Sequence, residues 1–155
     1  MKFSAREDIE APINYVFLRI SDFQIFERQA LNRGADMQRI DSAPVLIAGS
    51  GWKISFNFKG KNRKLKVTIA SLDTPNRLRI DAVSNDLDGV TQVELVALAP
   101  NRTRISVALD LSPKNLSARL LLQSLKLGKS SLTRRFKIHV TEFAEKIEED
   151  YHKNV

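Results

Sequence analysis

Few residues of this sequence have side chains suited to acid–base chemistry or metal binding. The histidines are His139 and His152, both near the C-terminus, and cysteine is absent. A zinc site needs several His or Cys ligands at close spacing, and a hydrolytic triad of the common type needs a G-x-S-x-G elbow. Neither pattern occurs in the sequence, so we expect no metal, no cofactor and no catalytic residue.

Aromatic residues point instead to a binding surface. Trp52, Ile54, Phe56 and Phe58 alternate with Lys53, Ser55 and Asn57. This alternation is typical of a strand with one apolar face. Because ligand pockets are mostly apolar with a few placed polar groups, such a strand is a candidate wall of a site for an apolar molecule.

A second candidate wall comes from residues 113–151, which the periodicity predicts to be one long amphipathic helix. Its apolar stripe, drawn at about 100° per residue, contains Ala118, Leu121, Leu125, Leu132, Phe136, Val140, Phe143 and Ile147. Lys129 projects into this stripe if the helix is continuous, whereas a kink at Gly128 would turn it to solvent. His139 lies at the margin of the stripe, where a packing role is favoured over proton transfer.

The elements that position these walls can be predicted from the same patterns. Residues 2–9 alternate as a strand whose apolar face is interrupted by Glu7, and Pro12 suits the start of a short helix. A second short helix should stop at Gly34. Strands separated by turns then continue to residue 111. The predicted fold class is α+β, with a curved antiparallel sheet of about seven strands and the long C-terminal helix packed across it.

This order of elements resembles the START-like (SRPBCC, helix-grip) superfamily, which includes birch-pollen-type allergens, lipid-transfer domains and polyketide cyclases. The resemblance covers the whole chain and is clearest in Ala11-Pro12-Ile13 before Val16-Phe17 and Asp22, in Gly49-Ser50-Gly51-Trp52, and in the last helix. It implies a cavity between the curved sheet and the terminal helix.

The favoured hypothesis is non-catalytic binding or transport of an apolar small molecule or lipid in that cavity. The expected lining is Trp52, Phe56, Phe58, Phe136, Val140 and Phe143, with Tyr15, Arg19 and His139 as polar groups. One alternative is a cyclase- or hydratase-type enzyme with His139 as its acid–base group. Another is a nucleic-acid-binding or ribosome-associated protein that uses a basic surface.

The positive charge makes polyanions candidate partners, since the formal net charge is +7 and the pI is near 9.9. A basic run straddles one predicted hairpin and consists of Lys59, Lys61, Arg63, Lys64 and Lys66. Four arginines lie on polar strand faces: Arg77, Arg79, Arg102 and Arg104. No aromatic residues alternate with them to stack on bases. We therefore favour a solvated outer sheet face over sequence-specific nucleic-acid binding.

The predicted long helix has a second apolar cluster opposite its main stripe, formed by Leu116, Leu120, Leu127 and Ile138. Packing within the chain is the favoured interpretation of this cluster. A homodimer contact is the first alternative. The second is peripheral docking on an anionic membrane, because basic residues lie nearby.

The length fits one domain over residues 1–155, large enough for its own core. No apolar run approaches the roughly 20 residues of a membrane span, and the first twenty residues lack the apolar centre of a signal peptide. We expect a soluble, cytoplasmic protein without a transmembrane segment.

Overall fold

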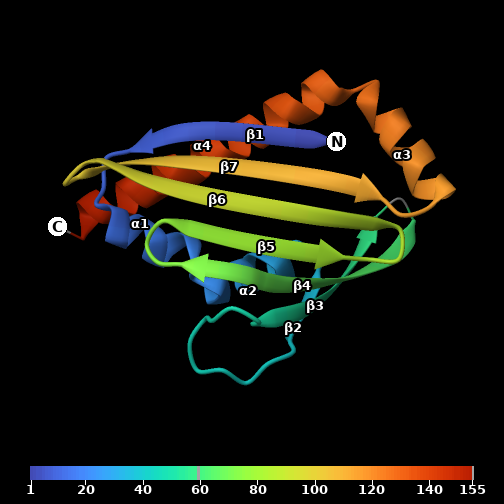
Figure 1. Ribbon diagram of the computed structural model, residues 1–155, viewed down its shortest axis with the longest axis horizontal. Coiled ribbons are helices and arrows are strands. Elements are labelled where there is room, and N and C mark those ends of the chain that lie inside the picture. The colour runs from blue at the N-terminus through green and yellow to red at the C-terminus, as the bar shows by residue number, and fades with distance from the viewer. Residues whose placement is uncertain (59, 155) are drawn as a thin grey trace.

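Seven strands form one open sheet in the computed structural model, which describes residues 1–58 and 60–154, and the helices lie behind the sheet or beyond its end (Figure 1). The strands are β1 (Lys2–Ile9), β2 (Asp36–Arg39), β3 (Gly51–Phe58), β4 (Lys61–Asp73), β5 (Arg77–Val83), β6 (Leu87–Ala99) and β7 (Arg102–Pro113). The helices are α1 (Ile13–Ile20), α2 (Phe23–Asn32), α3 (Leu116–Lys126) and α4 (Lys129–Lys153).

The strands pair in the order β1-β7-β6-β5-β4-β3-β2, and every pair is antiparallel. Each hairpin therefore joins neighbours, and β1 closes the far edge by pairing with β7. The predicted α+β class, the seven strands and the two short helices after the first strand are confirmed.

Glu7, which interrupts the apolar face of β1, accepts a hydrogen bond of 2.6 Å from the hydroxyl of Thr141 on α4.

The two short helices form where the sequence indicates. α1 starts directly after Pro12, whose φ of −64° already suits a helix, and it buries Val16, Phe17 and Ile20. α2 ends just before Gly34, whose φ of 84° lies in the left-handed region that favours glycine. The helices bring an apolar face and several aromatic rings to one part of the sheet.

The prediction of a single C-terminal helix is wrong in one respect, because the helix is broken at Leu127 and Gly128. α3 ends at Lys126, α4 begins at Lys129, and the two form an elbow (Figure 1). Glycine has a low helix propensity, which makes such a break inexpensive. Lys129 is exposed beside the break, so the alternative of a kink that turns it to solvent is the one observed.

The orientation predicted for the apolar stripe is confirmed, because each of its members is buried or partly buried. The second cluster is different: Leu116, Leu120, Leu127 and Ile138 are 69%, 55%, 92% and 47% exposed. The expectation that this cluster packs within the chain is therefore wrong.

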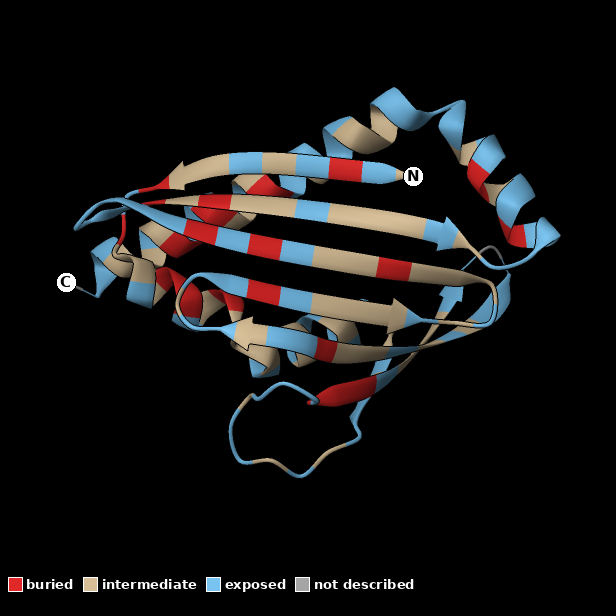
Figure 2. Ribbon diagram, in the orientation of Figure 1, coloured by how far each residue is buried: buried red, intermediate tan, exposed pale blue. Residues whose placement is uncertain are grey.

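The core lies where α1, α2 and the C-terminal half of α4 meet the sheet (Figure 2). It includes Ile9, Val16, Phe17, Trp52, Ile69, Leu95, Ile105 and Ile147. Among the described residues, no helix has an apolar stretch long enough to cross a bilayer.

Candidate functional site

The face of the sheet turned toward the helices, called the inner face here, is built from side chains that face each other across neighbouring strands. In an antiparallel pair, directly opposed residues project to the same side. Phe56 opposes Arg63, and Ala82 opposes both Val67 and Gly89. Leu109 of β7 opposes both Thr91 of β6 and Phe3 of β1. The inner face therefore runs continuously from β3 to β1.

The helices cover this face unevenly. We call the region packed under α1, α2 and α4 the closed part and the region near α3 the open part. The open part contains a hollow of about 590 Å³, which is within the size range of small-molecule sites. Its apolar lining residues are Phe56, Phe58, Leu65, Ala82, Leu87, Leu109, Leu111 and Leu121.

Hydrogen bonds hold α3 beside the hollow. The Lys114 backbone N–H donates to the Asp86 carbonyl at 2.8 Å, and its ammonium donates to the Ser84 carbonyl at 2.8 Å. Asn115 donates its side-chain amide to Asp86 at 2.7 Å and caps α3 by accepting from the Ala118 N–H at 2.8 Å. The start of α3 is thus fixed to the β5–β6 turn, and Leu121 of α3 faces the hollow.

Arg63 and Lys61 are the basic side chains of β4 on the inner face. Arg63 opposes Phe56, its guanidinium carbon lies 6.0 Å from the centre of the Phe58 ring, and its Nη1 lies 3.9 Å from Asp86 Oδ2. The outer-face interpretation of the whole basic run is therefore wrong for these two residues, while Lys59 lies outside the described residues. Arg63 places a positive charge at the rim of an apolar hollow.

The position of Arg63 could have been found from the sequence. Arg63, Leu65, Val67 and Ile69 alternate with period two, so extending the apolar pattern of β4 toward its start puts the guanidinium on the apolar face. The cluster of charges around Arg63 masks this alternation in the sequence.

Trp52, predicted as a cavity residue, belongs to the closed part. Its side chain is fully buried, its ring stacks on Phe23 with centroids 4.7 Å apart, and its indole N–H donates to Glu27 at 2.7 Å. Phe143 lies against Phe26 with centroids 6.0 Å apart. These aromatic rings fill the space between the sheet and the helices instead of lining the hollow.

Tyr15 and Arg19, predicted as polar pocket residues, belong to α1 and contact residues of α4. The Arg19 guanidinium donates to Asp150 at 2.7 Å and to the Tyr15 hydroxyl at 3.4 Å. The hydrogen bond from Arg19, joined by one from Lys146, lowers the pKa of the Asp150 carboxyl. The Tyr15 ring also contacts the Tyr151 ring, with centroids 5.0 Å apart. The group connects two helices and does not face the hollow.

The remaining predicted residues lie along α4. Phe136 packs against Phe3 with centroids 5.8 Å apart, and Val140 is buried. His139 is exposed and is not among the residues that line the hollow. The structure therefore brings only Phe56 and Phe58, of the nine predicted site residues, to the hollow.

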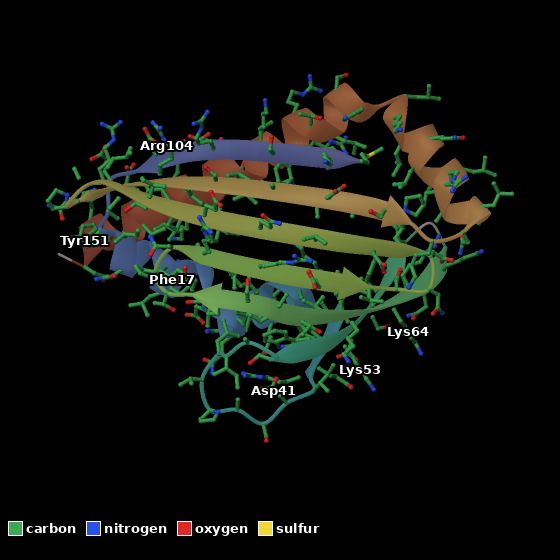
Figure 3. The ribbon with its side chains drawn as sticks, viewed as in Figure 1. Phe17, Asp41, Lys53, Lys64, Arg104 and Tyr151 are labelled. Atoms are coloured by element: carbon green, nitrogen blue, oxygen red, sulfur yellow. The ribbon has the colours of Figure 1, made fainter. Side chains whose placement is uncertain are left out.

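The outer face of the sheet carries many of the basic residues, and Figure 3 shows Lys53 and Lys64 pointing away from the helices. Several arginines of this surface pair with acids: Arg79 with Asp81 at 3.0 Å, and both Arg102 and Arg104 with Asp8 at 3.2 and 2.8 Å. The hydrogen bond from Arg104 is the main cause of a lowered pKa at Asp8. Pairing of this kind interrupts a continuous phosphate-binding stripe.

Within residues 1–58 and 60–154, no group of three or more His, Cys, Asp or Glu side chains is arranged to hold a metal ion. The polar groups near the hollow are the charged rim residues and amide or hydroxyl side chains of the strand ends.

Solved structures with the same fold match nearly the whole chain. TTHA0849 from Thermus thermophilus has 15% sequence identity and a TM-score of 0.67 over 95% of this chain and 97% of that chain. The Zhui aromatase/cyclase from Streptomyces sp. R1128 has 10% identity and a TM-score of 0.65 over 96% and 93%. A START superfamily protein from Mycobacterium smegmatis has 13% identity and a TM-score of 0.52 over 86% and 95%.

No family model matches the sequence. No curated protein matches it either. The chain has the START-like helix-grip fold, as the resemblance predicted. At these identities the likeness concerns the fold alone, so the function must be argued from this chain's own residues.

Proposed function

We propose that this chain binds or transports an amphipathic small molecule or lipid in the open part of its inner face, without converting it chemically. The observation that supports this most directly is the hollow of about 590 Å³ with a mainly apolar lining and a charged rim. Burial of an apolar body there would supply affinity, and a few polar groups would fix its orientation.

Arg63 is the residue we assign to the polar end of the ligand. Its contact with Asp86 is long, at 3.9 Å, and its side chain is partly exposed. A carboxylate or phosphate on the ligand could accept hydrogen bonds from the guanidinium, which presents several donors in one plane. The preferred ligand class is therefore an apolar body with one anionic group, such as a long-chain carboxylate.

The predicted site residues would have either a direct or an indirect role in binding. Phe56 and Phe58 would contact the ligand, whereas Trp52, Phe143 and Val140 would hold the closed part rigid behind them. An acid–base role for His139 is not supported, because its side chain is exposed on α4.

The test is a titration with a fluorescent long-chain carboxylate, in which Thr91→Phe is designed to fill the hollow from the inner face. Gln92→Phe, one residue along β6 and on the exposed outer face, is the matched control. We expect saturable binding in the unmodified protein and in the control, and at least about tenfold weaker binding in Thr91→Phe. Equal binding by both variants would contradict the proposal.

A second pair of variants tests the polar end. Arg63→Gln should weaken binding of the carboxylate about tenfold, the size expected for losing a charge-assisted hydrogen bond, and leave the corresponding uncharged alcohol unaffected. Lys66→Gln, on the outer face of the same strand, should change neither. Recovery of a chemically altered probe after incubation would favour the cyclase- or hydratase-type alternative.

A further inference from the structure

The outer side of α3 is a leucine ridge that the rest of the chain leaves uncovered. Leu116 and Leu120 belong to α3, and Leu127 follows its last residue with helical backbone angles. The three lie within about 40° of one another around the helix axis and are 69%, 55% and 92% exposed. The opposite side of α3 is attached to the protein through Ala118 and Leu122, which are buried. One side of this helix is therefore anchored, and the other presents leucines to the surroundings.

The charge around the ridge has a single sign. Every charged residue between positions 111 and 141 is a lysine or an arginine: Lys114, Arg119, Lys126, Lys129, Arg134, Arg135 and Lys137. All seven are exposed. Lys114 pairs with Asp88 at 3.4 Å, and the other six form no ion pair with another described residue. The outer sheet face differs, because there the arginines are partly neutralised by Asp8, Asp81 and Glu94.

A leucine ridge beside unpaired cations fits an anionic bilayer better than other occupants. A second copy of the chain docked on the same ridge would bring two basic surfaces together, which is unfavourable. A single-stranded nucleic acid would need aromatic side chains for stacking, and the ridge offers leucines. An anionic bilayer satisfies both features, since apolar side chains enter its interface and Lys and Arg interact with its head groups.

We propose that the α3 elbow docks on the surface of an anionic phospholipid bilayer, with Leu116, Leu120 and Leu127 inserted and Arg119, Lys126 and Lys129 at the head groups. The elbow projects from one end of the molecule (Figure 1), so the rest of the fold would not obstruct the approach. Leu121, on the other side of α3, lines the hollow, so docking brings the wall of the hollow to the membrane. The docking itself does not depend on what the hollow binds.

The test is flotation of the full chain with vesicles of phosphatidylcholine alone or with about a third of phosphatidylglycerol. We expect binding to the anionic vesicles and at least about tenfold less to the neutral ones. Raising the salt concentration from about 0.1 to about 0.5 M should weaken binding about tenfold, because the charges at the surface are screened. Equal binding to both vesicle types, or to neither, would overturn the proposal.

Matched variants separate the ridge from general surface effects. The triple change Leu116→Ser, Leu120→Ser and Leu127→Ser should abolish flotation, whereas Leu18→Ser, Leu31→Ser and Val45→Ser, at comparably exposed positions elsewhere, should not. The double change Lys126→Glu and Lys129→Glu should likewise abolish flotation with anionic vesicles. Its control, Lys53→Glu with Lys66→Glu on the sheet, should not. Thermal unfolding of each variant verifies that it is folded.

Two outcomes would favour a different occupant. If the control variants lost vesicle binding as strongly as the ridge variants, the ridge would not be the docking surface. If sedimentation showed a dimer that the ridge variant loses, and no vesicle binding occurred, the ridge would be a contact between two copies and the proposal would be wrong.

Discussion

The closed and open parts of the inner face are built from the same sheet, but they differ in what covers them. In the closed part, α1, α2 and α4 fill the face with side chains such as Val16, Phe23 and Ile147, and Trp52 is completely buried. In the open part, α3 approaches with Leu121, and a hollow of about 590 Å³ remains.

From this difference we expect the closed part to supply most of the stability and the open part to be the region that the proposed ligand contacts. Close-packed side chains lose contacts when one is removed, so the closed part should determine the free energy of unfolding. Apolar residues around a hollow have fewer neighbours to lose, so the open part should tolerate change in the folded state and respond in ligand binding.

The largest effect is expected for Trp52→Ala in the closed part. The change removes the stack on Phe23 and the hydrogen bond to Glu27, and truncating a buried aromatic residue costs about 3 to 5 kcal/mol. Urea unfolding followed by circular dichroism measures the loss. A cost below about 1 kcal/mol would show that this region is not the main core.

The next effect concerns the attachment of α3. Leu122 is buried and Leu120 is exposed on the same helix, so Leu122→Ala should destabilise by about 2 to 3 kcal/mol and Leu120→Ala by less than about 0.5 kcal/mol. Chemical denaturation of the two variants gives the comparison. Equal costs would mean that α3 is not held by its inner side.

A smaller effect on stability is expected for Phe56→Ala in the open part. The side chain is only partly buried, so the cost should be about 1 kcal/mol or less, while binding of a long-chain carboxylate should weaken about tenfold. Unfolding and titration are measured on the same preparation. A loss of stability as large as that of Trp52→Ala would remove the distinction between the two parts.

The smallest effect is expected at the loop before β3. Asp41 accepts hydrogen bonds from Arg39 and from the N–H groups of Gly51 and Ala43, and these lower the pKa of its carboxyl well below its usual range. Because the pKa of this carboxyl is lower in the folded state than in the unfolded state, the carboxylate stabilises the folded state at pH values above its ordinary pKa of 3.8. This contribution is lost as the pH falls below that value.

Asp41→Asn should therefore lower the melting temperature at pH 7 and reduce its dependence on pH below about pH 4. Asp36→Asn, an exposed aspartate on β2, is the control and should follow the unmodified protein. A pH profile of Asp41→Asn identical to that of the unmodified protein would exclude this role.

The sequence was sufficient to predict the fold because its local patterns agree with the tertiary arrangement. Period-two alternation in β3 and the helical stripe from Leu132 to Ile147 each mark the side that faces the core. Turn residues such as Gly34 stand at the observed ends of elements. The break at Gly128 was visible only as an alternative, because a glycine permits a bend without requiring one.

The site was harder to predict, for a physical reason. Alternation shows that Trp52 and Phe56 face the helices, but it does not show which of them another side chain covers. That depends on the placement of α2, which brings Phe23 onto Trp52, and of α3, which leaves Phe56 beside a hollow. Long-range packing decides such questions, and single-strand patterns contain no information about it.

The most direct test of the division is to map the bound ligand on the ¹⁵N-labelled protein by NMR. Addition of a long-chain carboxylate should shift the amide signals of the open part, including Gly89, Thr91 and Leu111. Those of the closed part, such as Ile69 and Leu95, should stay in place. Shifts centred on the closed part or on the outer sheet face, or no shifts up to millimolar ligand, would contradict the account.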